Sequence, residues 1–402
     1  MTSEWHEVPL RELVGYISKG IAPSYAEEAS ESTIRVLNQK CNRNFRISYG
    51  DSRLHDTLKK KVPPERYVKP DDILINSTGA GTAGRIAQIE DVPSATTIDG
   101  HMILIRSNGK VTQKFLGYAL KAHQWEVLQL DEGSTGQTEL NRDRLLDEIM
   151  INYPVSLDEQ NAIVGTLESI DRKLIVNEQL NDNLEQQAQA IYHERFETAS
   201  PDDLHSGWRT VTLGEVATIL NKSFNPLKEP EMLLEHYSIP AFDEARFPVF
   251  DLSTSIKSNK FIIDASCFMI SKLNPTTKRV WKPYCLTGNA VCSTEFIVYK
   301  AKDKTITDFL YSVIDSNSFS DFMCSHVTGS TGSRQRTTPS DTLSYELILP
   351  SEDDLAEFQS LVSPMYAQIR INAIENDRLK RLRDSLLPKL MSGEIDVSAV
   401  QF

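Results

Sequence analysis

The chain has 402 residues, of which 40% are hydrophobic and 25% charged, a composition typical of globular proteins with two or three domains. No apolar run approaches the roughly 20 residues needed to cross a bilayer, and the acidic, polar N-terminus is unlike a secretory signal. The five cysteines are odd in number and form no C-x-x-C pair, which argues against a zinc or other metal site and fits a reducing compartment. We therefore expect a cytoplasmic protein without membrane contact.

The formal net charge of −13 is unevenly distributed along the chain. Residues 151–206 hold three basic against eleven acidic residues, and residues 351–402 hold six against nine. The other two segments are nearly neutral and contain local basic blocks. Because DNA binding depends on local positive faces that displace counterions from phosphates, the acidic total is compatible with it.

The first basic block runs from residue 35 to residue 69 and holds ten basic and three acidic residues. Its start, Asn38-Gln39-Lys40, mixes amides with cations. Asn and Gln amides can bond adenine edges and Arg can bond guanine, whereas isolated Lys and Arg mostly hold phosphates. A solvated charged loop is the alternative. The candidate DNA-binding residues of this block are Asn38, Lys40, Arg43, Arg46, Arg53, Lys59, Lys60 and Lys61.

A glycine-rich stretch follows at residues 78–84. It has neither the G-K-[ST] ending of a phosphate loop nor G-x-G-x-x-G spacing, so a tight turn between strands is the better interpretation. Arg85, directly after it, is a candidate phosphate contact. The surrounding globular segments combine short strands and helices. Strand-like composition occurs at residues 72–76, 102–105, 267–270 and 296–299, and helix-like composition at 125–128 and 309–311.

Residues 163–191 carry a strict heptad seam of apolar positions with steps of four and three. Two asparagines, Asn177 and Asn181, lie in the middle of that seam. Asparagine in an apolar seam lowers stability but fixes register and partner, because its amide must find another amide. We expect a helix of about 35 residues, or roughly 50 Å.

A second basic block lies between residues 265 and 294, which contain no carboxylate. A tryptophan, Trp281, stands among its cations. Its candidate DNA-binding residues are Lys272, Lys278, Arg279 and Lys282, and a solvated loop is again the alternative.

Two polar loops with many hydrogen-bond donors occupy corresponding parts of the chain, and each either contacts DNA or caps the segment that follows it. Their candidate residues are Ser134, Thr135 and Gln137 in the first loop and Ser330, Thr331, Arg334 and Arg336 in the second.

The second helical seam spans residues 358–390 at a constant offset of 195 from the first, and it again has two central asparagines, Asn372 and Asn376. The matched asparagines favour pairing of the two helices with each other over packing of each on its own domain. A globular segment separates the helices, so an antiparallel pair with a pseudo-two-fold axis is expected. Pro364 lies inside the pattern, and we expect the helix to begin or kink there.

The chain is therefore a tandem duplication. Residues 8–13 are echoed by 211–216, and Gly-Ser-Thr-Gly at 133–136 is echoed at 329–332. Each polar loop precedes an apolar stretch that ends in proline, Pro154 or Pro350, before the long helix. Several matches in the same order at a nearly constant offset indicate two copies of one domain.

Catalytic signatures are missing from the sequence. It contains no H-E-x-x-H, no G-x-S-x-G and no complete N-P-P-[YF] or D-P-P-Y tetrapeptide of a DNA amino-methyltransferase. Asn225-Pro226-Leu227 and Asn274-Pro275-Thr276 come nearest, and neither continues correctly.

These features resemble the specificity subunit of type I restriction-modification systems over essentially the whole chain. The resemblance lies in short motifs of the two globular segments, in the first polar loop, in the start of the first long helix, and in the C-terminal ending. The matching segments are 36–40, 133–145, 154–177, 236–243 and 386–395. One departure is that the second copy has Glu352-Asp353-Asp354 after Pro350, where the first has Glu159-Gln160 after Pro154. Any contact of that pair is therefore expected in the first copy alone.

The resemblance implies an α+β fold in which two mixed α/β target recognition domains are joined by two long antiparallel coiled-coil helices as a pseudo-two-fold tandem repeat. The expected domains are 1–154 and 201–350 for recognition, 155–200 for the first spacer helix, and 351–402 for the second spacer helix and tail. It also implies binding of a bipartite double-stranded DNA site, with two methyltransferase subunits and further restriction subunits as partners. The chain itself is expected to bind no cofactor and to lack catalysis, with S-adenosylmethionine, ATP and Mg²⁺ on its partners.

Two other classes stay open from the residues alone. One is a single-chain methyltransferase or nuclease with an unrecognised site, and the other is a coiled-coil scaffold that binds no nucleic acid. Binding of S-adenosylmethionine by the chain alone would support the first, and failure to shift random duplex at low salt would support the second.

Overall fold

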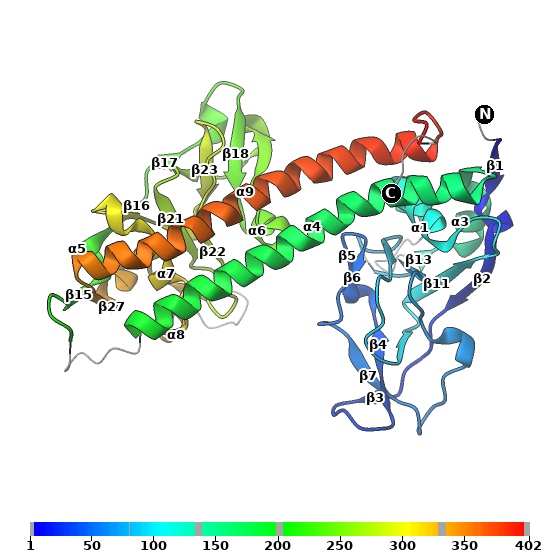
Figure 1. The fold of residues 1–402 in the computed structure, drawn as a ribbon, viewed down its shortest axis with the longest axis horizontal. Coiled ribbons are helices and arrows are strands. Elements are labelled where there is room, and N and C mark those ends of the chain that lie inside the picture. Colours follow the sequence, from blue (N-terminus) through cyan, green and yellow to red (C-terminus); the bar gives the residue numbers. More distant parts are fainter. Residues whose placement is uncertain (1–3, 80, 133–138, 198–203, 329–334, 398–402) are drawn as a thin grey trace. The chain divides into compact units, whose positions relative to one another are not determined.

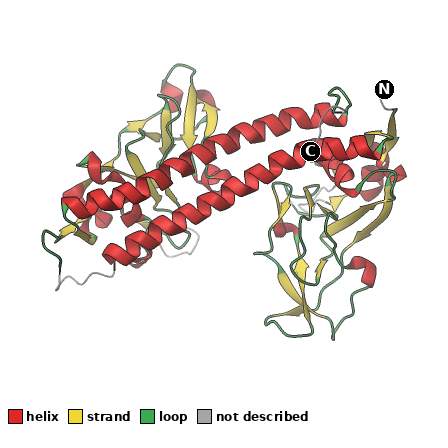
Figure 2. Ribbon diagram, in the orientation of Figure 1, coloured by secondary structure: helices red, strands yellow, loops and turns green. Residues whose placement is uncertain are grey.

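The computed structural model describes residues 4–79, 81–132, 139–197, 204–328 and 335–397, and it divides into two units (Figures 1 and 2). Unit 1 comprises residues 1–173 with 380–402, and unit 2 comprises residues 174–379. Each unit contains one globular part and a portion of each of the two longest helices. Within the described ranges, no helix is long and apolar enough to span a membrane.

The central sheet of unit 1 has four antiparallel strands in the order β2-β11-β8-β9. Their bounds are Val14–Lys19 (β2), Met102–Ser107 (β11), Ile73–Asn76 (β8) and Ile86–Gln88 (β9). β8 and β11 are apolar runs whose alternate side chains point to opposite faces. Ile73 and Ile103 pack with α1 (Gln113–Ala122), whereas Leu74 and Leu104 pack with residues of a second sheet.

The second sheet of unit 1 has the order β10-β4-β7-β3, in which β10 and β4 are parallel. Its strands are Thr96–Ile98 (β10), Thr33–Leu37 (β4), Arg53–Asp56 (β7) and Tyr25–Ala26 (β3). Smaller elements complete the globular part. They are the hairpin β5 (Asn42–Arg43) and β6 (Arg46–Ile47), the pair β12 (Asp131–Glu132) and β13 (Glu139–Leu140), and the helices α2 (Gln124–Val127) and α3 (Arg142–Glu148).

Unit 2 repeats this arrangement. Its central sheet has the order β16-β24-β21-β22, with bounds Ala217–Leu220, Phe296–Ala301, Cys267–Ser271 and Val280–Trp281. Phe268 and Tyr299 face α7 (Thr307–Ile314), and Met269 and Val298 face the second sheet. The helices α5 (Leu213–Val216) and α8 (Asn317–Ser325) and the pair β25 (Val327–Thr328) and β26 (Arg336–Thr337) complete this layer.

The second sheet of unit 2 has five strands in the order β17-β20-β23-β18-β19. Their bounds are Ser223–Phe224, Lys260–Ile262, Ala290–Ser293, Leu233–Tyr237 and Val249–Leu252. The parallel pair β18 and β23 corresponds to β4 and β10 of unit 1, and helix α6 (Ile239–Ala245) follows β18. The outer strands differ between the units, so the copies agree in the central sheet and diverge in the second.

The duplication also fixes how each globular part meets its helix. β1 (Trp5–Pro9) pairs antiparallel with β14 (Met150–Pro154) in unit 1, and β15 (Arg209–Thr212) pairs with β27 (Glu346–Leu349) in unit 2. In both copies, the second strand of the pair leads directly into a long helix. The strands expected from sequence are confirmed as β8, β11, β21 and β24, and the short helices as α2 and α7.

The two long helices are α4 (Leu157–Tyr192), of 36 residues, and α9 (Glu352–Met391), of 40 residues. A serine hydroxyl accepts a hydrogen bond from the first turn of each, Ser156 from the Glu159 amide and Ser351 from the Asp354 amide. A π-helical turn at His193–Glu197 continues α4. Within unit 1 and within unit 2 the two helices run antiparallel (Figure 1).

The expectation that α9 begins or kinks at Pro364 is wrong as to its start, because the helix begins at Glu352 and runs through that proline. A proline in a helix interior removes one hydrogen bond and costs about 3 kcal/mol. Phe358, Val362 and Tyr366 on either side of it are buried in the unit 2 core. Burial contributes about 1.5–3 kcal/mol for each large apolar side chain, which outweighs the missing bond.

The sequence departure after Pro350 has a smaller effect than expected. The Trp5 indole donates to Glu159 Oε1 at 3.3 Å in unit 1, and the Trp208 indole donates to Asp354 Oδ2 at 2.6 Å in unit 2. The carboxylate contact is therefore present in both copies, and that part of the expectation is wrong. The glutamine contact differs, because Gln160 accepts from the Thr112 amide at 2.8 Å, whereas its counterpart in unit 2 is a buried leucine.

Candidate nucleic-acid interface and helical spacer

The first candidate residues lie on a short 3-10 helix after β4 and on the β5–β6 hairpin. Asn38 caps the 3-10 helix by accepting from the Lys40 amide at 2.9 Å, and its amide group donates to the Asp51 carbonyl at 2.8 Å. Asn38 therefore uses both ends of its amide on the protein backbone. Lys40 and Arg43 are exposed and Arg46 is half-buried, so this edge of unit 1 presents a cluster of cations.

The hairpin that carries Arg43 and Arg46 turns through two residues with positive φ, Asn44 at 52° and Phe45 at 62°. Positive φ at both central positions is the geometry of a tight hairpin turn. The Phe45 ring packs against the unit 1 core with the Lys121 ammonium 4.9 Å from its centroid. This anchoring fixes the direction in which the hairpin cations project.

The remaining cations of the first block lie on and after β7. The Arg53 guanidinium stacks over Tyr25 at 3.3 Å, Lys59 lies 3.8 Å from Asp56, and Lys60 donates to the Ala22 carbonyl at 2.8 Å. Arg53, Lys59, Lys60 and Lys61 are all exposed. Exposed cations held by one weak contact remain available to phosphates. Their role in DNA binding stays a prediction.

Residues 81–84 form a turn between β8 and β9, as expected, and Gly79, Gly81 and Gly84 have positive φ. Arg85 follows the turn and donates to the Gly81 carbonyl at 3.3 Å. Six other candidates, Ser134, Thr135, Gln137, Ser330, Thr331 and Arg334, lie outside the described residues.

Three cations of the second basic block form ion pairs within unit 2. Lys278 lies 3.0 Å from Asp315, Arg279 donates to both carboxylate oxygens of Asp243 at 2.6 and 2.9 Å, and Lys282 pairs with Asp308. These carboxylates belong to distant parts of the sequence, which is why the block looked unpaired there. Lys272 is half-buried beside β21. The contribution of this block to DNA binding stays a prediction.

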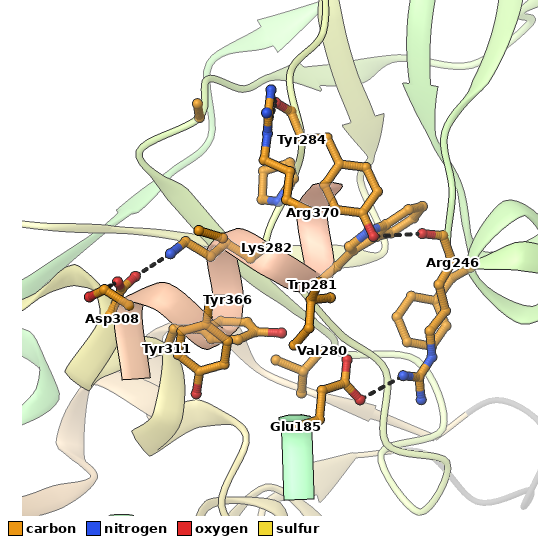
Figure 3. Close-up of a pocket in the computed structure, with 16 residues that line it drawn as sticks. Glu185, Arg246, Val280, Trp281, Lys282, Tyr284, Asp308, Tyr311, Tyr366 and Arg370 are labelled. Carbon is orange, nitrogen blue, oxygen red and sulfur yellow. Dashed lines mark hydrogen bonds and ion pairs between the residues drawn. The ribbon is translucent and has the colours of Figure 1, made fainter. Parts of the chain in front are cut away.

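Figure 3 shows the surroundings of this block, a cavity of about 310 Å³ between the globular part of unit 2 and its helices. Trp281, Tyr284 and Tyr366 form aromatic walls. The dashed lines mark the Lys282–Asp308 pair, an Arg246–Glu185 pair of 2.8 Å, and the hydrogen bond of 3.2 Å that the Tyr284 hydroxyl donates to the Arg246 carbonyl. Burial raises the pKa of the Glu185 carboxyl, and this effect outweighs the lowering of that pKa by the nearby Arg246 guanidinium. The second basic block therefore lies where the globular part of unit 2 packs on its helices, and its cations there are ion-paired.

Arg336, on β26, is the described candidate of the second polar loop. Its Nε and Nη2 donate to the two carboxylate oxygens of Glu295 at 3.0 and 3.1 Å. Its side chain is 43% exposed, so the guanidinium is oriented and still accessible.

The predicted asparagine pairing is confirmed within unit 2. Asn177 Nδ2 donates to Asn376 Oδ1 at 2.8 Å, and Asn372 Nδ2 donates to Asn181 Oδ1 at 2.8 Å. Glu375 also accepts from Asn177 at 2.7 Å. Asn177, Asn372 and Asn376 are buried, so any slip of one helix along the other would strand their amides without partners.

Replacing Asn177 by alanine is expected to lower the free energy of unfolding by about 1–3 kcal/mol, because it leaves the buried Asn376 oxygen without a donor. Replacing Asn177 and Asn376 together by leucine is expected to restore that stability. Urea unfolding measures both effects. Asn183→Ala, an exposed asparagine of the same helix, is the control and should change the free energy by less than about 0.5 kcal/mol. Equal effects of Asn177→Ala and the control would contradict the pairing.

A second polar cluster lies between the helices within unit 1. Asp171 Oδ2 accepts from the Tyr118 hydroxyl at 2.8 Å and from Lys121 at 3.2 Å, and its Oδ1 accepts from Arg383 at 3.0 Å. Burial alone would raise the pKa of Asp171, but the two cations outweigh it, and the pKa lies below its ordinary value. Arg383 lies within the second helical seam, residues 358–390, whereas Tyr118 and Lys121 come from α1 and were not predicted.

These observations define the class of protein: a duplicated mixed α/β module whose copies each pack on a shared antiparallel helix pair. A family model described as "Type I restriction modification DNA specificity domain" matches residues 2–186. The type I restriction enzyme MjaIX specificity subunit of Methanocaldococcus jannaschii is 25% identical over 96% of this chain and 92% of its own length. The HindI specificity subunit of Haemophilus influenzae is 33% identical over 93 residues, which are 23% of this chain and 20% of that subunit.

The fold is shared with a solved structure. The type I restriction-modification S subunit from M. genitalium superposes with a TM-score of 0.58 at 16% identity, covering 97% of this chain and 96% of that one. The chain is therefore similar to a type I restriction-modification specificity subunit over nearly its whole length, and residues 2–186 carry the match to the DNA specificity domain.

Proposed function

We propose that the chain binds a bipartite double-stranded DNA site, with one half-site read by unit 1 and the other by unit 2, and that it positions methyltransferase and restriction subunits on that site. The observation that carries the proposal is the pattern of agreement between the copies. They share the central sheet and the junction with the helices, and they differ in the second sheet and in its loops. A common framework with different loops suits two different half-sites.

Catalysis is assigned to the partners. The chain is proposed to bind no cofactor itself, while S-adenosylmethionine, ATP and Mg²⁺ act on the methyltransferase and restriction subunits. Among the described residues, no group of three or more His, Cys, Asp or Glu side chains is arranged to hold a metal ion.

The electrostatic part of the proposal rests on the exposed cations of unit 1. Replacing Lys40 and Arg43 together by alanine is expected to weaken binding to all duplexes alike. It should also lower the slope of log binding constant against log salt by about 0.9 for each phosphate that the variant no longer neutralises. Arg378→Ala, an exposed arginine of α9, is the matched control and should leave the slope unchanged. An unchanged slope in the double variant would contradict phosphate binding at this edge.

The proposed function is tested with the chain purified together with the methyltransferase subunits of its own system. Binding to a randomised duplex library at several salt concentrations should enrich one split sequence with a fixed unread gap. S-adenosylmethionine binding by the chain alone would favour a single-chain enzyme. Absence of any binding to random duplex at low salt would favour a scaffold.

A further inference from the structure

Three side chains meet at the edge of unit 1 beside the glycine turn. Thr78 Oγ1 donates to Gln39 Oε1 at 3.4 Å and lies 2.8 Å from His101 Nδ1. A hydroxyl has a single proton, so His101 Nδ1 is the donor to Thr78 when Thr78 donates to Gln39. The result is a short chain of hydrogen bonds that ends in a glutamine amide. His101 is exposed and Gln39 is half-buried, so the chain lies at the surface.

A buried network of two asparagine amides holds the backbone of Gln39. Asn76 Nδ2 donates to the Gln39 carbonyl at 3.2 Å, and Asn42 Nδ2 donates to Asn76 Oδ1 at 3.2 Å and to the Arg85 carbonyl at 2.8 Å. Asn42 and Asn76 are both almost fully buried, and the Asn42 oxygen has no partner among the described residues. Buried polar groups are costly, and a network of them fixes the orientation of what it holds.

Gly79 belongs to the same arrangement. Its φ of +116° favours glycine, and a Cβ there would lie 2.9 Å from Gln39 Oε1 and 2.3 Å from Thr82 Oγ1. The missing side chain at Gly79 leaves room for the Gln39 amide and the Thr82 hydroxyl in the positions that they take.

Unit 2 places different groups at the corresponding point. Asn76 on β8 pairs with Met102, and Ser271 on β21 pairs with Phe296. The residues before β11 and β24 are therefore equivalent, and they are His101 and Glu295. Thr78 bridges Glu139 in unit 1, and its counterpart Leu273 bridges Arg336 in unit 2. Glu295 thus occupies the position of His101, and Arg336 occupies that of Glu139, which bridges Thr78 at the same edge of unit 1.

The chemistry of both groups suits bases better than phosphates. Gln39 has no charge, so it adds no counterion release. Glu295 neutralises Arg336 and occupies its Nε and Nη2 edge, which leaves the edge formed by Nη1 and Nη2 facing away from the carboxylate. A neutralised, oriented guanidinium is a weak phosphate ligand but keeps the planar fork that matches guanine O6 and N7.

We propose that the edge of the fold beside the residue before β11 or β24 carries a base-reading side chain in both units, Gln39 for an adenine in unit 1 and Arg336 for a guanine in unit 2. Gln39 Oε1 would accept from adenine N6 while Nε2 donates to N7, and Arg336 would donate to guanine O6 and N7. The proposal rests on the proposed function and deepens it, because it assigns one base to each half-site.

The test uses the complex with its own methyltransferase subunits and competition binding to duplexes substituted singly at every position of the two half-sites. Gln39→Ala should reduce discrimination at one A·T pair by about 5- to 150-fold, and Arg336→Ala should do the same at one G·C pair of the other half-site. Each variant should leave the opposite half-site and the salt slope unchanged. Gln187→Ala and Arg378→Ala, exposed residues of the same types on the long helices, are the controls and should change no preference.

Conservative variants separate reading from structural support. Arg336→Lys keeps the charge but removes the fork, so it should reduce discrimination as Arg336→Ala does. Gln39→Glu keeps the size of the side chain but replaces Nε2, the proposed donor to adenine N7, with an oxygen. It should therefore reduce discrimination at the same A·T pair, and it tests the proposal if the alanine variant fails to assemble. Gly79→Ala should affect the same base pair as Gln39→Ala.

Two results would overturn the proposal. One is unchanged base preference in the Gln39 and Arg336 variants while the wild-type complex still selects a split site. The other is a uniform loss of affinity with a lower salt slope, which would make either residue a phosphate contact. A wild-type complex without any sequence preference would instead refute the proposed function itself.

Discussion

Asp171→Asn is expected to lower the free energy of unfolding of unit 1 by about 3–5 kcal/mol. The substitution keeps the shape of the side chain but removes the charge that two buried cations share. Lys121 and Arg383 have side chains only 10% and 14% exposed, so Lys121 would be left largely unsolvated beside a neutral amide, while Arg383 would keep only its pair with Asp384. Removing one partner from a buried ion pair is among the most costly single changes.

Hydrogen–deuterium exchange measures this destabilisation locally, in peptides that cover α1 and residues 163–173. Amides there should exchange faster in the variant, while those of unit 2 keep their rates. Asp182→Asn, an exposed carboxylate on the same helix, is the control and should change stability by less than about 0.5 kcal/mol. Unchanged exchange in unit 1 would contradict a stabilising role for the cluster.

The cluster also predicts a pH dependence of stability. Because the pKa of folded Asp171 lies below its ordinary value, its stabilising contribution is fully present above the pKa of the unfolded chain. That contribution is lost as the pH falls through the lowered pKa of the folded state. The difference in stability between wild type and Asp171→Asn should therefore shrink as the pH is lowered below about 4. A difference that grows on acidification would contradict this assignment.

The second large effect concerns the spacing of the DNA site. Inserting one heptad into each long helix, near Asn177 and near Asn372, keeps the seam in phase because the insertion equals the repeat. Each heptad adds about 10 Å to a helix, close to three base pairs of duplex. The unread gap is therefore expected to lengthen by about three base pairs, or to shift by that increment among related gaps, while both half-sites stay the same.

Sequencing of methylated sites in cells that carry the lengthened chain measures the gap directly. A single insertion of three residues into each helix is the matched control, since it breaks the seam and should abolish activity rather than lengthen the gap. Altered half-sites at an unchanged gap would reject the spacer mechanism.

The helical spacer was the part of the fold most fully predicted from sequence. A seam with regular steps and matched asparagines depends on local periodicity, and the amide pairs Asn177–Asn376 and Asn181–Asn372 appear as expected. The Asp171 cluster was not predictable in the same way. Its partners Tyr118 and Lys121 lie about 50 residues away on α1, and nothing local links them to the seam.

The candidate interface likewise includes residues that local sequence predicts and residues whose contacts come from distant segments. Lys40 and Arg43 are exposed, as a local basic block with few carboxylates nearby in the sequence suggests. The block around Trp281 also lacks local carboxylates, yet Asp243, Asp308 and Asp315 reach it from distant segments. Gln39, which follows β4 of the second sheet, and His101, which precedes β11 of the central sheet, each bond Thr78, and no short motif encodes that meeting.

The most direct test of the central claim is the methylation pattern produced by the chain with its own methyltransferase subunits. Sequencing should show one split motif, with two different half-sites and a gap of fixed length. The central claim also predicts that exchanging the globular part of unit 2 for that of a relative alters one half-site and leaves the other intact. Methylation at a continuous motif, or a change in both half-sites after the exchange, would contradict the account.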